Sequence, residues 1–190
     1  MQIEAIDICK AYGENVVLNG FSQTFAHGKT TAIMGQSGCG KSTLLAVLMG
    51  TVEADSGKIV AESFKKSAVF QEDRLCDNLT AAANIRLITG KKFSPDELSR
   101  EFAAVGLDGC ENKPVRELSG GMKRRVALLR ALLAEYDVLF LDEPFKGLDE
   151  VTKNDVMGYV RRKTTGKTVI LVTHDKTECE TLADETIQLK

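Results

Sequence analysis

An octapeptide at residues 35–42, Gly-Gln-Ser-Gly-Cys-Gly-Lys-Ser, constrains this chain more than any other feature. It follows an apolar run at residues 30–34 that is typical of a buried strand, and it precedes leucines and valines at helical spacing. Glycines allow the backbone to curl so that successive N–H groups point inward at the oxygens of a phosphate. The helix start that follows offers its positive end to the same anion. The order of strand, glycine loop and helix therefore predicts a phosphate site in an α/β fold.

The side chains of this loop indicate which phosphate compound it binds. Lys41 supplies a mobile positive charge for the β and γ phosphates of a nucleotide. The Ser42 hydroxyl is a hard oxygen ligand, of the kind that Mg²⁺ prefers. The residues expected to bind the nucleotide here are Gly35, Gln36, Ser37, Gly38, Cys39, Gly40, Lys41, Ser42 and Thr43.

A second apolar run, Val138–Leu141, ends in two adjacent carboxylates, Asp142 and Glu143. Because ligands of parallel sheets lie at the carboxyl ends of the strands, both side chains are predicted to lie near the phosphate loop. Asp142 is placed to hold the Mg²⁺ shell. Glu143 is placed to take a proton from an attacking water.

Short apolar runs separated by helical patterns predict the fold class. Runs at 30–34, 67–70, 138–141 and 169–172 are bounded by polar or turn residues, as is typical of strands buried on both faces of a parallel sheet. Before residue 26, short strands are expected around a turn at Gly13-Glu14-Asn15 and a hairpin signal at Asn19-Gly20. We expect an α/β phosphate-loop NTPase core with a mainly parallel sheet and an N-terminal antiparallel β-subdomain.

Residues 72–117 differ from the rest, because they contain helical patterns and no convincing strand. Ser94, Pro95 and Glu97 combine an N-cap, a proline at the first helical position and a capping-box glutamate. An apolar stripe then reaches Val105, and Gly106 is expected to end the helix. We predict a single domain over residues 1–190, with a helical subdomain inserted at about 72–117.

The composition excludes several classes of protein. Lys and Arg total 25 against 27 Asp and Glu, a net charge of −2, so the strongly basic footprint of a nucleic-acid binder is absent. Five cysteines without a Cys-x-x-Cys pair argue against a disulfide framework and a zinc site. The first residues lack a secretory pattern, and no run approaches the ~18 apolar residues of a membrane span. We expect a soluble, cytoplasmic protein.

A second candidate anion site lies at the start of a helix predicted over 122–133. Ser119 precedes Gly120 and Gly121, so a hydroxyl and several N–H groups converge there. A nucleotide held between two copies of the chain would use this site and the phosphate loop together. The basic run that follows, Lys123-Arg124-Arg125, is interpreted as the solvated first turn of the helix.

With these motifs in this order, nearly the whole chain resembles the ATP-binding subunit of an ABC transporter. Residues 35–42 resemble the Walker A loop, Leu118–Met122 the signature motif, and Val138–Glu143 the Walker B strand. The resemblance implies that the nucleotide is ATP, that Mg²⁺ accompanies it, and that two subunits form a nucleotide sandwich. Glu143 is then the catalytic carboxylate.

The resemblance also implies roles for residues outside these motifs. Gln71 resembles the Q-loop glutamine, which senses Mg²⁺ and the transmembrane partner, and His174 resembles the switch histidine that contacts the γ phosphate. The resemblance thus implies that Gln71 joins Ser42 and Asp142 at the metal, and that Gln71 and His174 join Glu143 as catalytic residues. Gly147-Leu148-Asp149 resembles the D-loop, and Asp149 also suits the N-cap of a helix over 150–163. Tyr12 resembles the aromatic residue that stacks on adenine.

The chain departs from the family pattern at two points. Met122 stands where the signature usually has glutamine, which removes a polar contact; with Glu143-Pro144-Phe145 it resembles the nitrate, sulfonate and taurine importer group. The chain is also short for the family, so the helical insertion is expected to be trimmed. No regulatory domain is expected after a strand at 186–189.

The expected function is ATP hydrolysis that powers solute transport by a permease on a separate chain. The subunit is then peripheral on the inner face of the cell membrane, and it pairs with a second copy or a second ATPase subunit. A non-transport ATPase of the same superfamily, acting on DNA or the ribosome, is the main alternative, although the chain lacks the long coiled coil or second cassette of those types. A small phosphate-loop kinase would leave Leu118–Met122 without a role. No nucleic acid partner is expected.

Overall fold

The computed structural model describes residues 2–189 and contains two sheets. Three antiparallel strands have the order β2-β1-β4, and five strands, all parallel, have the order β5-β6-β7-β3-β8. The strands are β1 (Ile3–Tyr12), β2 (Asn15–Phe25), β3 (Thr30–Met34), β4 (Ser56–Val60), β5 (Lys66–Val69), β6 (Val138–Asp142), β7 (Thr168–Val172) and β8 (Glu185–Gln188). The expected fold class, an α/β core with an antiparallel β-subdomain, is confirmed.

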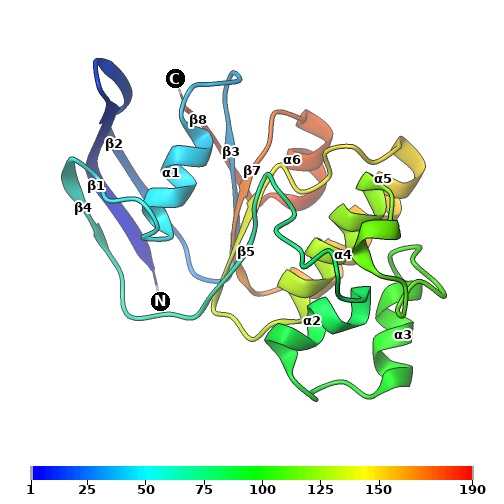
Figure 1. Cartoon of the computed structure of the whole chain (residues 1–190). Helices are drawn as coiled ribbons and strands as arrows, with labels where there is room; N and C mark the ends of the chain where they lie inside the picture. Colours follow the sequence, from blue (N-terminus) through cyan, green and yellow to red (C-terminus); the bar gives the residue numbers. More distant parts are fainter. Residues whose placement is uncertain (1, 190) are drawn as a thin grey trace.

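Helices cover both faces of the parallel sheet (Figure 1). They are α1 (Lys41–Leu48), α2 (Ala81–Thr89), α3 (Pro95–Ala103), α4 (Gly120–Leu133), α5 (Glu150–Thr164) and α6 (Lys176–Leu182), with a 3₁₀ turn at Val115–Glu117. Helix α1 lies between the two sheets, whereas α4, α5 and α6 lie on the other side of the parallel sheet. Helices α2 and α3 are at the end of the molecule away from the antiparallel sheet.

This layering gives the molecule two hydrophobic clusters, one on each face of the parallel sheet. Strand β6 contributes to both, because Val138 and Phe140 lie in the cluster around α1, and Leu139 and Leu141 lie in the cluster around α4. None of these four side chains is more than 1% exposed. Burial on both faces explains why β6, in the interior of the sheet, begins with an uninterrupted apolar run in the sequence.

The hairpin predicted at Asn19-Gly20 is wrong, because β2 runs without a break from Asn15 to Phe25. In the pairing with β1, Phe21 lies opposite Ile8 and Leu18 lies opposite Lys10, so the two intervening residues of β2 face a single residue of β1. Gly20 has a positive φ of 69°. The dipeptide therefore forms a bulge, in which glycine takes a backbone conformation that other residues avoid.

The segment 72–117 contains α2, α3 and the 3₁₀ turn, joined by an isolated bridge between Thr80 and Pro114. The capping box at the start of α3 is confirmed, with the Ser94 hydroxyl accepting from the Glu97 N–H and the Glu97 carboxylate accepting from the Ser94 N–H. In residues 2–189, no helix combines the length and the apolar character that crossing a bilayer requires.

Candidate functional site

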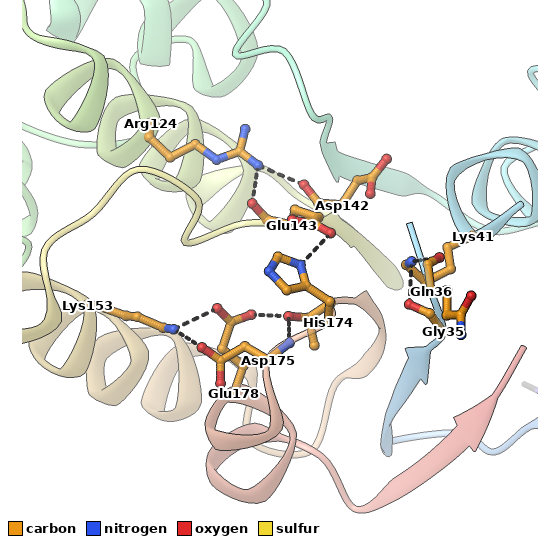
Figure 2. Close-up of polar contacts among 11 residues, drawn as sticks. Gly35, Gln36, Lys41, Arg124, Asp142, Glu143, Lys153, His174, Asp175 and Glu178 are labelled. Atoms are coloured by element: carbon orange, nitrogen blue, oxygen red, sulfur yellow. Dashed lines mark hydrogen bonds and ion pairs between the residues drawn. The ribbon is translucent and has the colours of Figure 1, made fainter. Parts of the chain in front are cut away.

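The glycine-rich loop connects β3 to α1, and its own carbonyls hold the side chain of Lys41 (Figure 2). Lys41 Nζ donates to the carbonyl oxygens of Gly35 and Gln36, both at 2.8 Å, and the residue is only 7% exposed. Gly40 has a φ of 97°, and a Cβ there would lie 2.6 Å from the side chain of Val17. A glycine is therefore required at this position for both conformation and space.

The loop forms part of a cavity of about 320 Å³. Nearly all of its lining residues are among those predicted from the sequence, and they come from β1, the loop, α1, the end of β5 and the end of β6. They are Tyr12, Ser37, Gly38, Gly40, Lys41, Ser42, Thr43, Gln71 and Glu143, together with Val17, which the sequence analysis missed. Segments far apart in the chain thus meet around the phosphate loop, as strand order in a parallel sheet predicts.

Tyr12, the last residue of β1, lines this cavity with a largely exposed side chain. The residue is 52% exposed, and Lys10 Nζ lies 5.6 Å from the centre of its ring. An exposed aromatic ring that lines the same cavity as the phosphate loop suits contact with a planar base. Stacking of adenine on this ring remains a prediction.

Asp142, at the carboxyl end of β6, is a buried carboxylate with an unsatisfied oxygen. The residue is 6% exposed, and its Oδ1 has no hydrogen-bond partner. Burial raises the pKa of the Asp142 carboxyl, against an opposing effect of the Ser42 hydroxyl. A buried carboxylate oxygen without a partner beside a serine hydroxyl fits a hard divalent cation, which would supply the missing contact.

Gln71 joins this pair from the loop that follows β5. Together with Ser42 and Asp142 it lines a second cavity, of about 430 Å³, which also reaches Arg74. Gln71 and Ser42 line both cavities. The three residues predicted to hold Mg²⁺ are thus brought together, at the boundary between the phosphate loop and the second cavity.

Glu143 follows Asp142 in an unusual backbone conformation. Its φ is 47°, which costs a non-glycine residue about 1–3 kcal/mol. Its N–H donates to the carbonyl of Val172 at 2.9 Å, and its Oε1 lies 2.9 Å from Nδ1 of His174. The sharp turn after β6 therefore directs the carboxylate toward the loop that follows β7 (Figure 2).

The interpretation of residues 123–125 as a solvated turn is wrong for Arg124. This residue is 3% exposed, and its guanidinium donates to the carbonyl oxygens of Asp142 and Glu143, both at 2.7 Å. Lys123 pairs with Asp77 at 3.5 Å, and Arg125 donates to the carbonyls of Val105 and Gly106. Placement on the inner side of α4, over the end of β6, removes Arg124 from water.

The second candidate anion site is at the exposed start of α4. Ser119 is the N-cap, and its hydroxyl accepts from the N–H of Met122 at 3.3 Å. A Cβ on Gly121 would lie 3.4 Å from the carbonyl of Gly147, so this helix start is packed against the turn that leads to Asp149. Neither Ser119–Gly121 nor Asp149 is among the residues lining the cavity at the phosphate loop.

Asp149 caps α5, as its position predicted. Its carboxylate accepts from the N–H of Thr152 at 3.0 Å, and this backbone hydrogen bond lowers the pKa of Asp149. The capping role is therefore confirmed, while a contact with nucleotide remains a prediction.

A buried ionic cluster that the sequence analysis missed lies behind His174 (Figure 2). Lys153 of α5 pairs with Asp175 and, at 3.1 Å, with Glu178 of α6. Glu178 also accepts from the Thr173 hydroxyl at 2.6 Å. The residues on either side of His174 are thus tied to α5, which fixes the loop that presents the imidazole.

A family model described as "ABC transporter" matches residues 18–146, which is more than half of the chain. The chain belongs to the ABC transporter family.

Relatives of this ABC transporter chain are ATP-binding subunits of importers. It is 39% identical over 185 residues to the aliphatic sulfonates import ATP-binding protein SsuB 2 of Paraburkholderia xenovorans, covering 95% of this chain and 74% of the relative. It is 34% identical to the spermidine/putrescine import ATP-binding protein PotA of Mycoplasma capricolum, covering 97% of this chain. The chain spans 58% of the length of that PotA protein.

Solved structures support the same fold. The ATP-binding cassette MJ0796, in a dimeric post-hydrolysis state bound to ADP and Pi, superposes with a TM-score of 0.87 at 27% identity. The match covers 99% of this chain and 94% of the cassette. The α/β architecture of this ABC transporter chain is therefore that of an ATP-binding cassette.

Proposed function

We propose that this chain is the ATP-hydrolysing subunit of an importer, and that it drives a permease encoded on a separate chain. One observation carries the proposal: a single cavity gathers the phosphate loop, Gln71 and Glu143. Such a cavity offers N–H groups and Lys41 for the phosphates of ATP, and a carboxylate that can act on water. The names of the relatives, all of them import proteins, support import over export.

Glu143 acts as the general base, because its carboxylate lies at the cavity and is held by a fixed backbone. His174, 2.9 Å from this carboxylate, orients it and contacts the γ phosphate. Lys41 exchanges its two loop carbonyls for phosphate oxygens when ATP binds. Ser42, Gln71 and Asp142 hold Mg²⁺, which when bound neutralises charge on the phosphates.

Two copies of the chain close around two ATP molecules. The start of α4 supports this, because Ser119 and Gly120 are exposed yet do not line the cavity of their own chain. A second copy brings that start of α4 to the phosphates, as a dimeric cassette such as MJ0796 allows. The chain is then one domain over 1–190, and its helical insertion at 72–117 transmits closure to the permease.

The permease holds this subunit at the inner face of the membrane. Sulfonates are anions and polyamines are cations, yet ATP-binding proteins for both are relatives of this chain. Selection of the solute therefore belongs to the permease and not to this subunit.

Hydrolysis by the purified chain tests the proposal. The rate per subunit should rise with protein concentration, because two half-sites must meet, and it should require Mg²⁺. A rate per subunit that stays constant over a wide concentration range contradicts the dimer. Uptake by vesicles that contain a candidate permease together with this subunit then tests transport, with Glu143→Gln as the inactive control.

A further inference from the structure

Arg124 makes an unusually complete set of hydrogen bonds from within the protein. A guanidinium has five N–H donors. Nε donates to the carbonyl of Pro144 at 3.0 Å, and Nη2 donates to those of Asp142 and Glu143, both at 2.7 Å. Nη1 donates to the carbonyl of Phe70 at 2.5 Å and to the Asp73 carboxylate at 3.1 Å. Every donor therefore has a partner, and the residue is 3% exposed.

Three of these acceptors are the carbonyls of residues 142, 143 and 144, on both sides of the candidate base. The N–H of Glu143 is fixed as well, by the carbonyl of Val172. Glu143 has a φ of 47°, in a region that residues other than glycine rarely adopt. Arg124 thus supplies the contacts that hold a strained peptide, and this peptide sets the direction of the Glu143 carboxylate (Figure 2).

The other two acceptors belong to the segment that carries Gln71. Phe70 directly precedes Gln71, and Asp73 follows it by two positions. One planar group on α4, five positions after Ser119, therefore joins the Gln71 segment to the Glu143 turn. None of its hydrogen bonds reaches the phosphate loop at 35–43.

We propose that Arg124 is a positioning residue for ATP hydrolysis. It holds the Glu143 peptide and the Gln71 segment in one arrangement relative to the start of α4, so that the base is aligned when the second subunit closes. This inference rests on the proposed function, since it assigns the alignment of that same site. Because Arg124 does not touch the phosphate loop, it acts on the chemical step and not on the binding of ATP.

Other polar side chains lack the geometry for this role. Glutamine has two N–H donors and lysine has three around a compact charge, whereas the guanidinium presents five in a planar fork. Neither replacement can serve three consecutive carbonyls and the Gln71 segment together. The conservative change Arg124→Lys should therefore keep the positive charge but lose the alignment of the Glu143 turn with the Gln71 segment.

The test compares Arg124→Gln and Arg124→Lys with Arg162→Gln, which makes the same chemical change at an exposed position of α5. We expect kcat for ATP hydrolysis to fall about 10- to 100-fold in both Arg124 variants, the range that small misplacements of catalytic groups produce. The KM for ATP should stay within about twofold of the parent. The control should match the parent in both constants.

A purely structural role predicts a different result. Activity would then fall only in proportion to the unfolded fraction, which urea denaturation of each variant measures. An unchanged kcat in a folded Arg124 variant overturns the proposal, and so does a loss that lies entirely in KM.

Hydrogen exchange supplies a readout that does not depend on hydrolysis. Peptides covering residues 70–76 and 142–148 should exchange faster in both Arg124 variants, while 168–172 in β7 should keep the protection of the parent. Equal exchange in the first two segments overturns the inference, even if the parent chain proves inactive. An inactive parent with faster exchange in the variants contradicts the proposed function alone, and an active parent with unchanged kcat in the variants contradicts the inference alone.

Discussion

His174 Nδ1 lies 2.9 Å from Glu143 Oε1, although 31 positions separate them in the chain. The contact results from the register of the parallel sheet, in which Asp142 of β6 pairs with Val172 of β7. Glu143 follows directly after the end of β6 and His174 comes two positions after the end of β7, so both lie at the same edge of the sheet. The candidate base and the candidate switch histidine are aligned by backbone pairing before any nucleotide binds.

Glu143→Gln should abolish hydrolysis while leaving ATP binding intact. The amide keeps the shape of the carboxylate but cannot accept a proton, so we expect the rate to fall about 100-fold or more. The variant should accumulate as an ATP-bound dimer, visible as an earlier peak on size exclusion. Glu185→Gln, an exposed position on β8, is the matched control. Hydrolysis near the parent rate in Glu143→Gln would mean that another group takes the proton.

Much of the site could be predicted because its function depends on the backbone and on strand order. The phosphate loop needs glycines at fixed spacing, and the carboxylates must follow an apolar strand, so both are visible in the sequence. Arg124 was missed because its neighbours Lys123 and Arg125 make the segment look like a solvated charge run. The helical period indicates that Arg124 is on the inner face of α4, because Ala127 and Leu128 are three and four positions further along and both are buried.

In the fold, too, some elements could be predicted from the sequence and others could not. Parallel strands buried on both faces are apolar runs, so β3, β6 and β7 were predictable, and the short run at residues 67–70 was enough to indicate the edge strand β5. The strand β4 was not, because Ser56–Val60 is mostly exposed and contains a glycine. At Asn19-Gly20 a turn and a bulge both require a positive φ at glycine, and only the pairing with β1 distinguishes them.

The anion site at Ser119 can be tested with two variants of the same shape. Asparagine and aspartate both serve as N-caps, so Ser119→Asn and Ser119→Asp should each preserve the start of α4. Only aspartate places a negative charge where the phosphates of the opposite subunit are expected. ATP-driven dimerisation should therefore fail in Ser119→Asp and persist, if weakened, in Ser119→Asn.

Dimerisation is measured by analytical ultracentrifugation with Mg-ATP, and ATP binding to the monomer by calorimetry. Both variants should bind ATP through residues 35–43, since Ser119 does not line that cavity. Normal dimerisation of Ser119→Asp would contradict the nucleotide-sandwich dimer.

The reactivity of Cys39 should show whether bound nucleotide covers the phosphate loop. It is half-buried, and its Sγ lies where a Cβ on Gly35 would be only 2.6 Å away, so a bulky adduct must displace the loop. We expect a maleimide to inhibit hydrolysis and Mg-ATP to slow the labelling of Cys39. Cys76 is the exposed thiol and should be replaced by serine first, while Cys110 and Cys179 are buried.

Peptide mass mapping separates Cys39 from Cys9, which is also half-buried. Labelling of Cys39 at the same rate with and without Mg-ATP would show that bound nucleotide leaves this thiol uncovered. The variant Lys41→Ala then decides whether the loop binds ATP at all. If the loop is the ATP site, this variant should lose ATP binding.

The buried cluster behind His174 predicts a large effect of Lys153→Met on stability. Lys153 is 7% exposed and pairs with Asp175 and Glu178, so methionine leaves two carboxylates close together without a cation. Breaking a buried pair from one side costs about 3–5 kcal/mol in the free energy of unfolding. Lys163→Met is the matched control on α5: its partner is Glu101, its side chain is 35% exposed, and the expected cost is about 1 kcal/mol or less.

The pH dependence of this cost gives the sharper test. The hydrogen bond from Lys153 lowers the pKa of Asp175, so the stabilisation is present above the pKa of an unfolded aspartate, about 3.9, and is lost as the pH falls through the lower folded value. Burial lowers the pKa of Lys153, but the hydrogen bonds to Asp175 and Glu178 outweigh it and the pKa is raised. That contribution is present below about pH 10.4 and is lost as the pH rises through the folded value.

Urea denaturation of the parent and Lys153→Met should therefore give a constant difference between about pH 5 and 9, and a smaller one at pH 3. Adding Glu178→Gln to Lys153→Met should recover part of the loss at pH 7, because one of the two unpaired carboxylates is removed. A difference that is the same at pH 3 and pH 7 would show that packing of the lysine stem, and not its charge, joins α5 to the loop that carries His174.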